Sequence, residues 1–289
     1  MNDDTQRRRF WAQQMDAAYD FMSKVLDYPV QECGEPLVSI PDAVRAAGVE
    51  VTFANSKLAI HHDRIFRLRE RLIPSLVAVA REMNSQGWIL RIEDGYRSRD
   101  MQRALFMQPA IFDEILKKVL WELDGEMPSP EFLFRRITVL TATRPKIGTH
   151  MSGSAVDISV WHAGHRREVD RGGPYIDLSE RTPMNSPFIP AEAGRNRAAI
   201  TRIMETHGFL AYPYEFWHYS QGDVYAEILT KSGRPGRYGA VDWNPTNEAI
   251  TPVPHPRDPL ASDNEIRLNI EAACKRIRRD TASGQEDLR

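Results

Sequence analysis

Cysteine is scarce in this chain of 289 residues, which contains two, Cys33 and Cys274, near opposite ends. The two do not form a C-x-x-C pair, so both a disulfide framework and a zinc site made of thiolates are disfavoured. Long apolar runs are also missing, and nothing approaches the about 18 consecutive apolar residues of a membrane helix. We therefore expect no disulfides and no membrane-spanning segment.

A signal peptide is not recognisable, because the basic cluster Arg7–Arg9 is not followed by an apolar stretch. We accordingly expect a cytoplasmic protein, with export in the folded state through the arginine cluster as the minor alternative. Positive and negative residues are nearly balanced, and the formal net charge is −2 at pH 7. Such a chain lacks the electrostatic footprint of a protein that binds nucleic acid or anionic membranes, and its substrate is not expected to be a polyanion.

The remaining composition, 42% hydrophobic and 27% charged residues, is typical of a globular protein. Apolar residues at helical spacing predict helices at 1–24, 65–83, 98–106, 109–136, 195–207 and 264–279. Alternating or β-branched segments predict strands at 88–92, 137–143, 155–161, 209–212 and 216–220. Residues 162–190 are expected to form a long loop. This mixture favours an α+β fold in which a small, mostly antiparallel sheet carries the functional site and helices pack against it.

Two segments, Gly148–Asp157 and Tyr214–Tyr219, carry residues that suggest metal chemistry. They contain two imidazoles and one carboxylate, His150, Asp157 and His218, and three such ligands with a fourth position open are typical of catalytic zinc. Asp157 lies in an otherwise apolar strand, where a carboxylate is costly unless it is paired or bound to a cation. His150 alone would more often be an ordinary surface or core histidine. The Ser-Gly-Ser turn between them lets both side chains point toward one site.

Glu215 and Arg97 are the candidate catalytic residues. Glu215 lies three residues before His218 and is placed to act on a water next to the metal, whereas the competing interpretation is an exposed carboxylate in an aromatic strand. Arg97 follows a predicted strand at a turn where side chains project into clefts, and its guanidinium can hold a carbonyl oxygen that becomes an oxyanion. A structural salt bridge is the alternative for Arg97. His162 and His165 form a less favoured metal pair in a loop.

Three segments in this order, Asp94–Arg97, His150–Asp157 and Glu215–His218, resemble the VanX-type D-alanyl-D-alanine dipeptidases. These enzymes belong to the zinc D-Ala-D-Ala peptidase superfamily, whose fold hedgehog proteins share. The resemblance covers about the middle two-thirds of the chain. It implies one Zn²⁺ per chain with His150, Asp157 and His218 as ligands. It also implies that Glu215 is the general base and acid and that Arg97 stabilises the transition state.

The resemblance further implies substrate-binding residues and domain limits. Thr149 is expected to contact the substrate, and Asp177, in the run Gly-Gly-Pro-Tyr-Ile-Asp, is expected to bind its free amine. The chain has Gly148 where the family usually has Ser and Ser152 where it often has Arg, which leaves the substrate open. We expect a single domain over 1–289, with a zinc peptidase core at 60–245 and peripheral extensions at 1–59 and 250–289.

The activity implied by the resemblance is hydrolysis of a small peptide, foremost the dipeptide D-Ala-D-Ala, by a zinc-activated water. A zinc D,D-carboxypeptidase or endopeptidase acting on cell-wall peptides and a dipeptidase of other specificity stay open as alternatives. A catalytically inactive, zinc-stabilised binding protein is a third alternative, disfavoured because neither Glu215 nor Arg97 is needed merely to hold zinc. The sequence indicates no nucleic-acid or membrane partner, and it does not indicate an oligomeric state.

Overall fold

Five strands form the central sheet of the protein. The computed structural model describes residues 3–286, with side chains through residue 277. The strands stand in the order β2, β4, β5, β7, β6, and their bounds are Val51–Phe53, Trp88–Asp94, Ala155–His162, His218–Ser220 and Leu210–Ala211. β2 runs parallel to β4, and the other neighbouring pairs in this sheet are antiparallel. The predicted α+β fold with a small, mostly antiparallel sheet is confirmed.

One face of the sheet carries the main hydrophobic core. Three helices pack there, α2 (Ile40–Ala46), α3 (Ile73–Ser85) and α7 (Ala191–Thr206). Their apolar side chains join alternate residues of the two central strands, Leu90, Ile92, Val156, Ile158 and Val160. Successive side chains of a strand point to opposite faces. Asp157, between Val156 and Ile158, therefore points away from this core.

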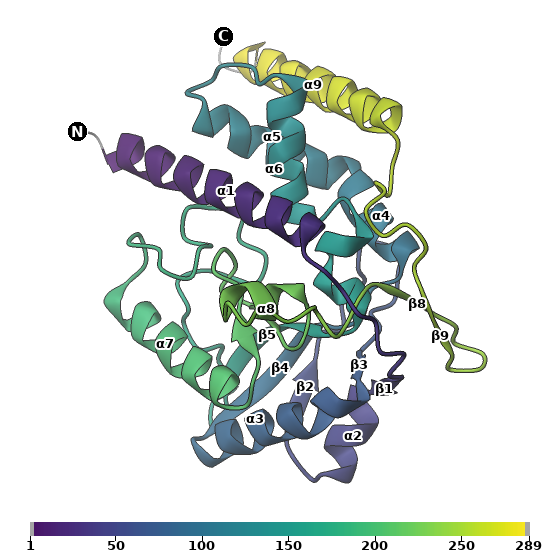
Figure 1. Cartoon of the computed structure of the whole chain (residues 1–289). Coiled ribbons are helices and arrows are strands. Elements are labelled where there is room, and N and C mark those ends of the chain that lie inside the picture. Colours follow the sequence, from purple (N-terminus) through teal and green to yellow (C-terminus); the bar gives the residue numbers. More distant parts are fainter. Residues whose placement is uncertain (1–2, 287–289) are drawn as a thin grey trace.

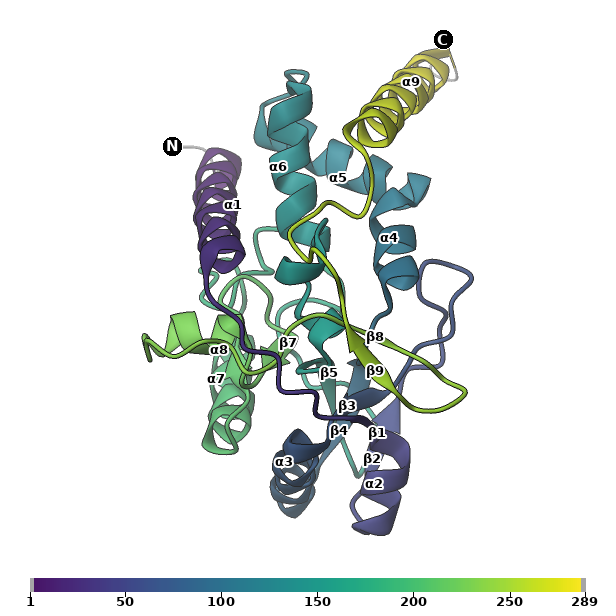
Figure 2. The same ribbon diagram turned by 45° about the vertical axis from the view of Figure 1, so that its right-hand side comes forward.

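A second group of helices lies at the other end of the molecule (Figure 1). Its members are α1 (Asp3–Asp27), α4 (Arg99–Met107), α5 (Pro109–Glu122), α6 (Pro130–Thr141) and α9 (Asp263–Glu286). The turned view shows the strands between this group and α2, α3 and α7 (Figure 2). Helices α5, α6 and α9 share a second core that includes Phe112, Ile115, Leu133, Ile137, Ile266 and Ile270. The molecule thus has two helical layers with the strands between them.

The strand predicted at 137–143 is wrong, because residues 137–141 belong to α6. Ser129 begins this helix by accepting a hydrogen bond from the Phe132 N–H, and Pro130 occupies its first turn. Both features are strong signals for the start of a helix. Leu133 and Ile137 recur at helical spacing and are buried in the second core. Packing of this helical face outweighs the β preference of the Ile, Thr and Val residues in the segment.

The helix predicted at 65–83 is shorter in the structure, where α3 begins at Ile73. Arg67–Arg69 instead forms β3, which pairs antiparallel with β1 (Leu37–Ser39), and Glu70–Leu72 forms a short 3-10 helix, η1. A longer helix would place Pro74 in its interior, where proline removes a hydrogen bond and clashes with the preceding turn. In the structure Pro74 lies in the first turn, where its missing N–H is not needed.

The predicted peripheral extensions at 1–59 and 250–289 contribute to the packed parts of the molecule through their described residues, 3–59 and 250–286. Strand β2 belongs to the central sheet, α9 packs in the second core, and α1 buries six side chains, Trp11, Met15, Ala18, Phe21, Met22 and Val25. The number of domains stays a prediction. Within the part of the chain that the structure describes, no helix has the length and apolar character needed to cross a membrane. The remaining elements are η2 (Pro145–Ile147), η3 (Thr149–Ser152), α8 (Val224–Leu229), β8 (Val241–Trp243) and β9 (Ile250–Pro252).

Candidate metal centre and active site

The strand register brings three polar residues into a row across the sheet. Asp157 on β5 lies opposite Asp94 of β4 on one side and opposite His218 of β7 on the other. His150 lies just before β5 in η3, and Gly153 ends that turn with φ of +67°. A Cβ added to Gly153 would lie 2.2 Å from Leu37 Cδ2, so this leucine would have to move, and the left-handed φ itself favours glycine. The turn lets His150 face Asp157.

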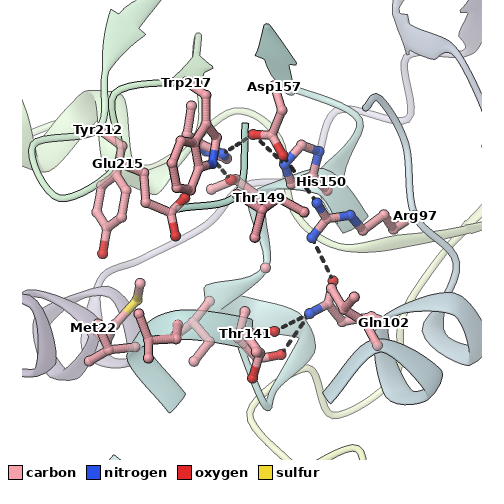
Figure 3. A pocket seen from close by; sticks show the side chains of 18 of the residues that line it. Met22, Arg97, Gln102, Thr141, Thr149, His150, Asp157, Tyr212, Glu215 and Trp217 are labelled. Carbon is pink, nitrogen blue, oxygen red and sulfur yellow. Dashed lines mark hydrogen bonds and ion pairs between the residues drawn. The ribbon is translucent and has the colours of Figure 1, made fainter. Parts of the chain in front are cut away.

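His150, Asp157 and His218 form one buried group that has the composition of a metal site. One ligand atom from each residue lies within 4.8 Å of the others. The Asp157 Oδ1 atom is 3.1 Å from His150 Nε2 (Figure 3). The same oxygen is 3.0 Å from His218 Nδ1. Two imidazoles and a carboxylate fit a catalytic zinc ion, which takes three protein ligands and keeps one open position.

In each imidazole ring, the nitrogen that does not face Asp157 forms a hydrogen bond that orients the ring. His150 Nδ1 donates to the Gly95 carbonyl oxygen at 2.7 Å, because a carbonyl can only accept. His218 Nε2 lies 2.9 Å from the Thr149 hydroxyl oxygen. These contacts leave Nε2 of His150 and Nδ1 of His218 facing Asp157. Hydrogen bonds of this kind set the orientation of metal-binding histidines, and Thr149, predicted as a substrate contact, lines the cavity and also holds His218.

Charge and burial favour the protonation states in which Asp157 and His218 can bind a cation. Burial alone would raise the pKa of Asp157, but His150 and His218 hold it well below its usual range, so the carboxylate is ionised. Burial lowers the pKa of His218, and Asp157 opposes this change. A neutral imidazole beside an ionised carboxylate is the protonation state that metal binding requires.

Arg97 forms the ion pairs that are one of the two interpretations of its sequence position. Its Nε donates to Asp94 Oδ2 at 2.7 Å, its Nη1 to Gln102 Oε1 at 3.3 Å, and its Nη2 to Asp157 Oδ2 at 3.2 Å. Burial would lower the pKa of Arg97, but Asp94 and Asp157 raise it, so the guanidinium stays charged. A guanidinium has five N–H donors, and this one lines the cavity beside the metal group. It therefore forms structural ion pairs, and its contact with a substrate oxygen stays a prediction.

Glu215 lies in the turn between β6 and β7, where its carbonyl oxygen accepts a hydrogen bond from the His218 N–H at 3.3 Å. Its partly buried side chain lines the same cavity as the metal group. Burial and, to a smaller extent, the charge of Asp157 raise the pKa of Glu215 to about 8, against the opposing effect of Arg97. A carboxyl group that exchanges a proton near neutral pH is suited to general acid–base catalysis.

Asp177 is not brought to the cavity, unlike its neighbours Tyr175, Ile176 and Leu178. Its carboxylate accepts a hydrogen bond from Ser179 Oγ at 2.8 Å and pairs with Arg181 at 2.9 Å. Both partners of the Asp177 carboxylate belong to the same loop as Asp177 itself. The position of Asp177 therefore does not favour the predicted contact with a substrate amine. The histidines of the HxxH pair, His162 and His165, have ring centroids 4.6 Å apart but lie outside the three-ligand group.

Two residues of the site have no signal in the sequence. The Tyr175 hydroxyl donates to Asp157 Oδ2 at 3.0 Å, and burial raises the pKa of Tyr175 well above its usual range, so it remains a donor. The Gln102 amide donates to the carbonyl oxygens of Thr141 and Ala142, which ties Arg97 to the end of α6. Tyr175 comes from the long loop and Gln102 from α4, and only the tertiary structure brings them here.

Comparison with known proteins agrees with this geometry. A family model described as D-Ala-D-Ala dipeptidase matches residues 57–231. The D-alanyl-D-alanine dipeptidase of Synechocystis sp. is 26% identical over 226 residues, which are 68% of this chain and 86% of that protein. The D-alanyl-D-alanine dipeptidase of Enterococcus faecium is 26% identical over 151 residues, 51% of this chain and 69% of that protein.

Among solved structures, the LdcB LD-carboxypeptidase is similar with 20% identity and a TM-score of 0.37, covering 71% of this chain and 76% of that chain. The family match spans more than half of the chain and includes the Arg97, His150–Asp157 and Glu215–His218 segments. The resemblance seen in the sequence is therefore confirmed, and the chain belongs to the D-Ala-D-Ala dipeptidase family and is a metallopeptidase.

Proposed function

We propose that this protein is a zinc-dependent dipeptidase that hydrolyses a small peptide of the D-Ala-D-Ala type, with one Zn²⁺ per chain. One observation carries the proposal. The buried His150, Asp157 and His218 group opens onto the same cavity that Glu215 and Arg97 line. The ligand group alone would serve a structural metal, whereas a carboxyl group with a raised pKa and a guanidinium beside it supply what peptide hydrolysis needs.

A bound Zn²⁺ supplies Lewis-acid polarisation of the scissile carbonyl and makes a nearby water more acidic. In the proposed reaction Glu215 accepts the proton of the attacking water and later delivers it to the leaving amine. Arg97 donates N–H groups to the carbonyl oxygen as negative charge develops on it. Tyr175 and Arg97 both bind Asp157 Oδ2, which fixes the carboxylate with Oδ1 toward the imidazoles. Asp177 has no part in this proposal because its carboxylate is paired outside the cavity.

The test is release of free D-alanine from D-Ala-D-Ala by the zinc-loaded protein. Glutamine in place of Glu215 keeps the shape but cannot accept a proton, so Glu215→Gln is expected to lower kcat by about 10²–10⁴-fold with zinc content unchanged. Glu192→Gln, an exposed change on α7, is the matched control and is expected to leave kcat unchanged. Full activity of Glu215→Gln would remove Glu215 from its assigned role.

N-acetyl-D-Ala-D-Ala separates the alternative activities, because acetylation removes the free amine. Cleavage of only the free dipeptide identifies a dipeptidase that needs this amine. Equal cleavage of both compounds instead identifies a carboxypeptidase with a more open site. A protein that binds zinc and cleaves neither compound would show that D-Ala-D-Ala is not the substrate, which leaves a dipeptidase of other specificity or a binding protein.

A further inference from the structure

The active-site cavity has an apolar wall that the proposed chemistry does not use. The cavity holds about 800 Å³ of space free of protein atoms, part of it open to solvent. Five apolar side chains, here called the apolar wall, line it from three helices and one loop: Leu105 of α4, Ile111 of α5, Leu140 of α6, and Ile176 and Leu178. All five are partly or largely exposed. The wall is therefore accessible to a ligand in the cavity.

The reacting groups occupy a different part of the cavity from the helical lining. Figure 3 shows Arg97, His150, Asp157 and Glu215 together on one side, with Thr141 of α6 on the opposite side. The charged side chains among the lining residues, Arg97, Asp157 and Glu215, all belong to the reacting groups. A substrate whose peptide bond lies at these groups would extend its side chain toward apolar residues.

Ile176 is the most unusual member of the apolar wall. It is 46% exposed and has φ of +57°, a left-handed conformation that a β-branched residue rarely adopts. The hydroxyl of its neighbour Tyr175 donates to Asp157 Oδ2, which places this part of the loop next to the candidate metal group. Unfavourable backbone conformations of this kind concentrate at ligand-binding sites. The strain presents an apolar side chain to the cavity beside the reacting groups.

D-Ala-D-Ala carries only two methyl groups, which cannot cover five large apolar side chains. We propose that the preferred substrate is a dipeptide in which one residue has a large apolar side chain, and that this side chain packs against the apolar wall. The inference rests on the proposed dipeptidase activity and names its substrate class. Burial of apolar surface supplies the binding energy, and the absence of charged residues from the wall disfavours a charged side chain.

The first test compares kcat/KM of the zinc-loaded protein for D-Ala-D-Ala, D-Ala-D-Leu and D-Leu-D-Ala. One extra methylene in an apolar pocket is worth about 10-fold or more, so one leucyl dipeptide is expected to exceed D-Ala-D-Ala at least about 10-fold. A higher kcat/KM for D-Ala-D-Ala than for both others would overturn the inference and leave the dipeptidase function intact. Absence of turnover with all three would instead overturn the proposed function, and the inference with it.

The second test uses the leucyl preference, defined as the ratio of kcat/KM for the better leucyl dipeptide to that for D-Ala-D-Ala. Ile176→Ala and Leu140→Ala are each expected to lower this ratio at least about 5-fold, since each removes apolar contacts that only the larger side chain reaches. Loss of folding would change both substrates together and leave the ratio unaltered.

Ile60→Ala is the matched control. Ile60 is also an isoleucine with a left-handed φ, +70°, and is 62% exposed, but it does not line the cavity. We expect Ile60→Ala to keep the leucyl preference of the unmodified protein. An unchanged ratio in both Ile176→Ala and Leu140→Ala, in variants that keep the kcat/KM of the unmodified protein for D-Ala-D-Ala, would refute the apolar wall as the specificity element.

Discussion

At the scale of single residues, Asp157 connects the two imidazoles of the candidate metal group to Arg97, the proposed stabiliser of the transition state, and to Tyr175. One carboxylate oxygen faces the two imidazoles, and the other accepts from Arg97 and Tyr175. A buried carboxylate with four partners is fully satisfied, which a lone carboxylate in this strand would not be. Each partner therefore helps to fix the position of Asp157 Oδ1. Substituting one partner at a time shows how much that partner contributes to metal binding.

Tyr175→Phe is expected to weaken zinc binding about 10–100-fold, because hydrogen bonds to metal ligands contribute this much to metal affinity. The change removes only the hydroxyl that binds Asp157 Oδ2. Zinc affinity is measured by competition with a chelator, and Tyr19→Phe on α1 serves as the control. Equal zinc affinity in Tyr175→Phe and the unmodified protein would contradict this role for the hydroxyl.

His218→Ala is expected to lose both bound zinc and activity, in contrast to Glu215→Gln, which loses activity alone. The substitution removes one of three proposed ligands and leaves Asp157 with one imidazole partner. Metal content per chain, determined by mass spectrometry of the dialysed protein, distinguishes the two variants. Stoichiometric zinc in His218→Ala would show that this histidine is not a ligand.

At the scale of elements, helix α1, which lies outside the family match at residues 57–231, packs beside the candidate site. Helix α1 buries Phe21 against Tyr225, with ring centroids 5.0 Å apart, and Met22 lines the active-site cavity. Tyr225 in turn donates from its hydroxyl to the Ile147 carbonyl oxygen, just before the segment that carries His150. The N-terminal helix thus supports one side of the cavity.

Phe21→Ala is expected to lower the free energy of unfolding by about 3–5 kcal/mol, since it empties a large buried site. Lys24→Ala, an exposed change on the same helix, is expected to change it by less than about 0.5 kcal/mol. Urea denaturation of both variants measures the difference. Equal stability of the two variants would indicate that α1 packs only loosely on the rest of the molecule.

At the scale of the whole molecule, residues far apart in the chain meet between the strands and the second group of helices. Arg97, His150, Tyr175 and Glu215 come from four separate segments. A metal that binds such a site holds these segments together in the folded state and has no comparable site in the unfolded chain. Metal binding is therefore expected to stabilise the whole fold.

Removal of zinc is expected to lower the melting temperature. A ligand at 100 times its Kd stabilises the folded state by about 2.7 kcal/mol, which at about 2.1 cal/mol/K per residue corresponds to roughly 4 °C for a chain of 289 residues. Differential scanning calorimetry with and without a chelator measures the shift. The same comparison on His218→Ala is the control and should show no zinc-dependent shift, whereas a shift equal to that of the unmodified protein would place the zinc elsewhere.

The sequence by itself determined the chemistry of the candidate metal group and its family. His150, Asp157, Glu215 and His218 are recognisable because their donor atoms and short spacings are local properties, and a carboxylate in an apolar strand indicates a partner. The paired strands β4 and β5 were predictable for the same reason, since their patterns reflect burial of neighbouring residues.

Only the tertiary structure decided which distant side chains share the cavity. Asp177 and Tyr175 lie two residues apart in one loop, yet Tyr175 binds Asp157 while Asp177 pairs with Arg181. Residues 137–141 have a local preference for strands, but their packing in the second core makes them helical. Contacts between segments depend on how whole elements pack, and the packing energy exceeds the local preferences that a sequence pattern reports.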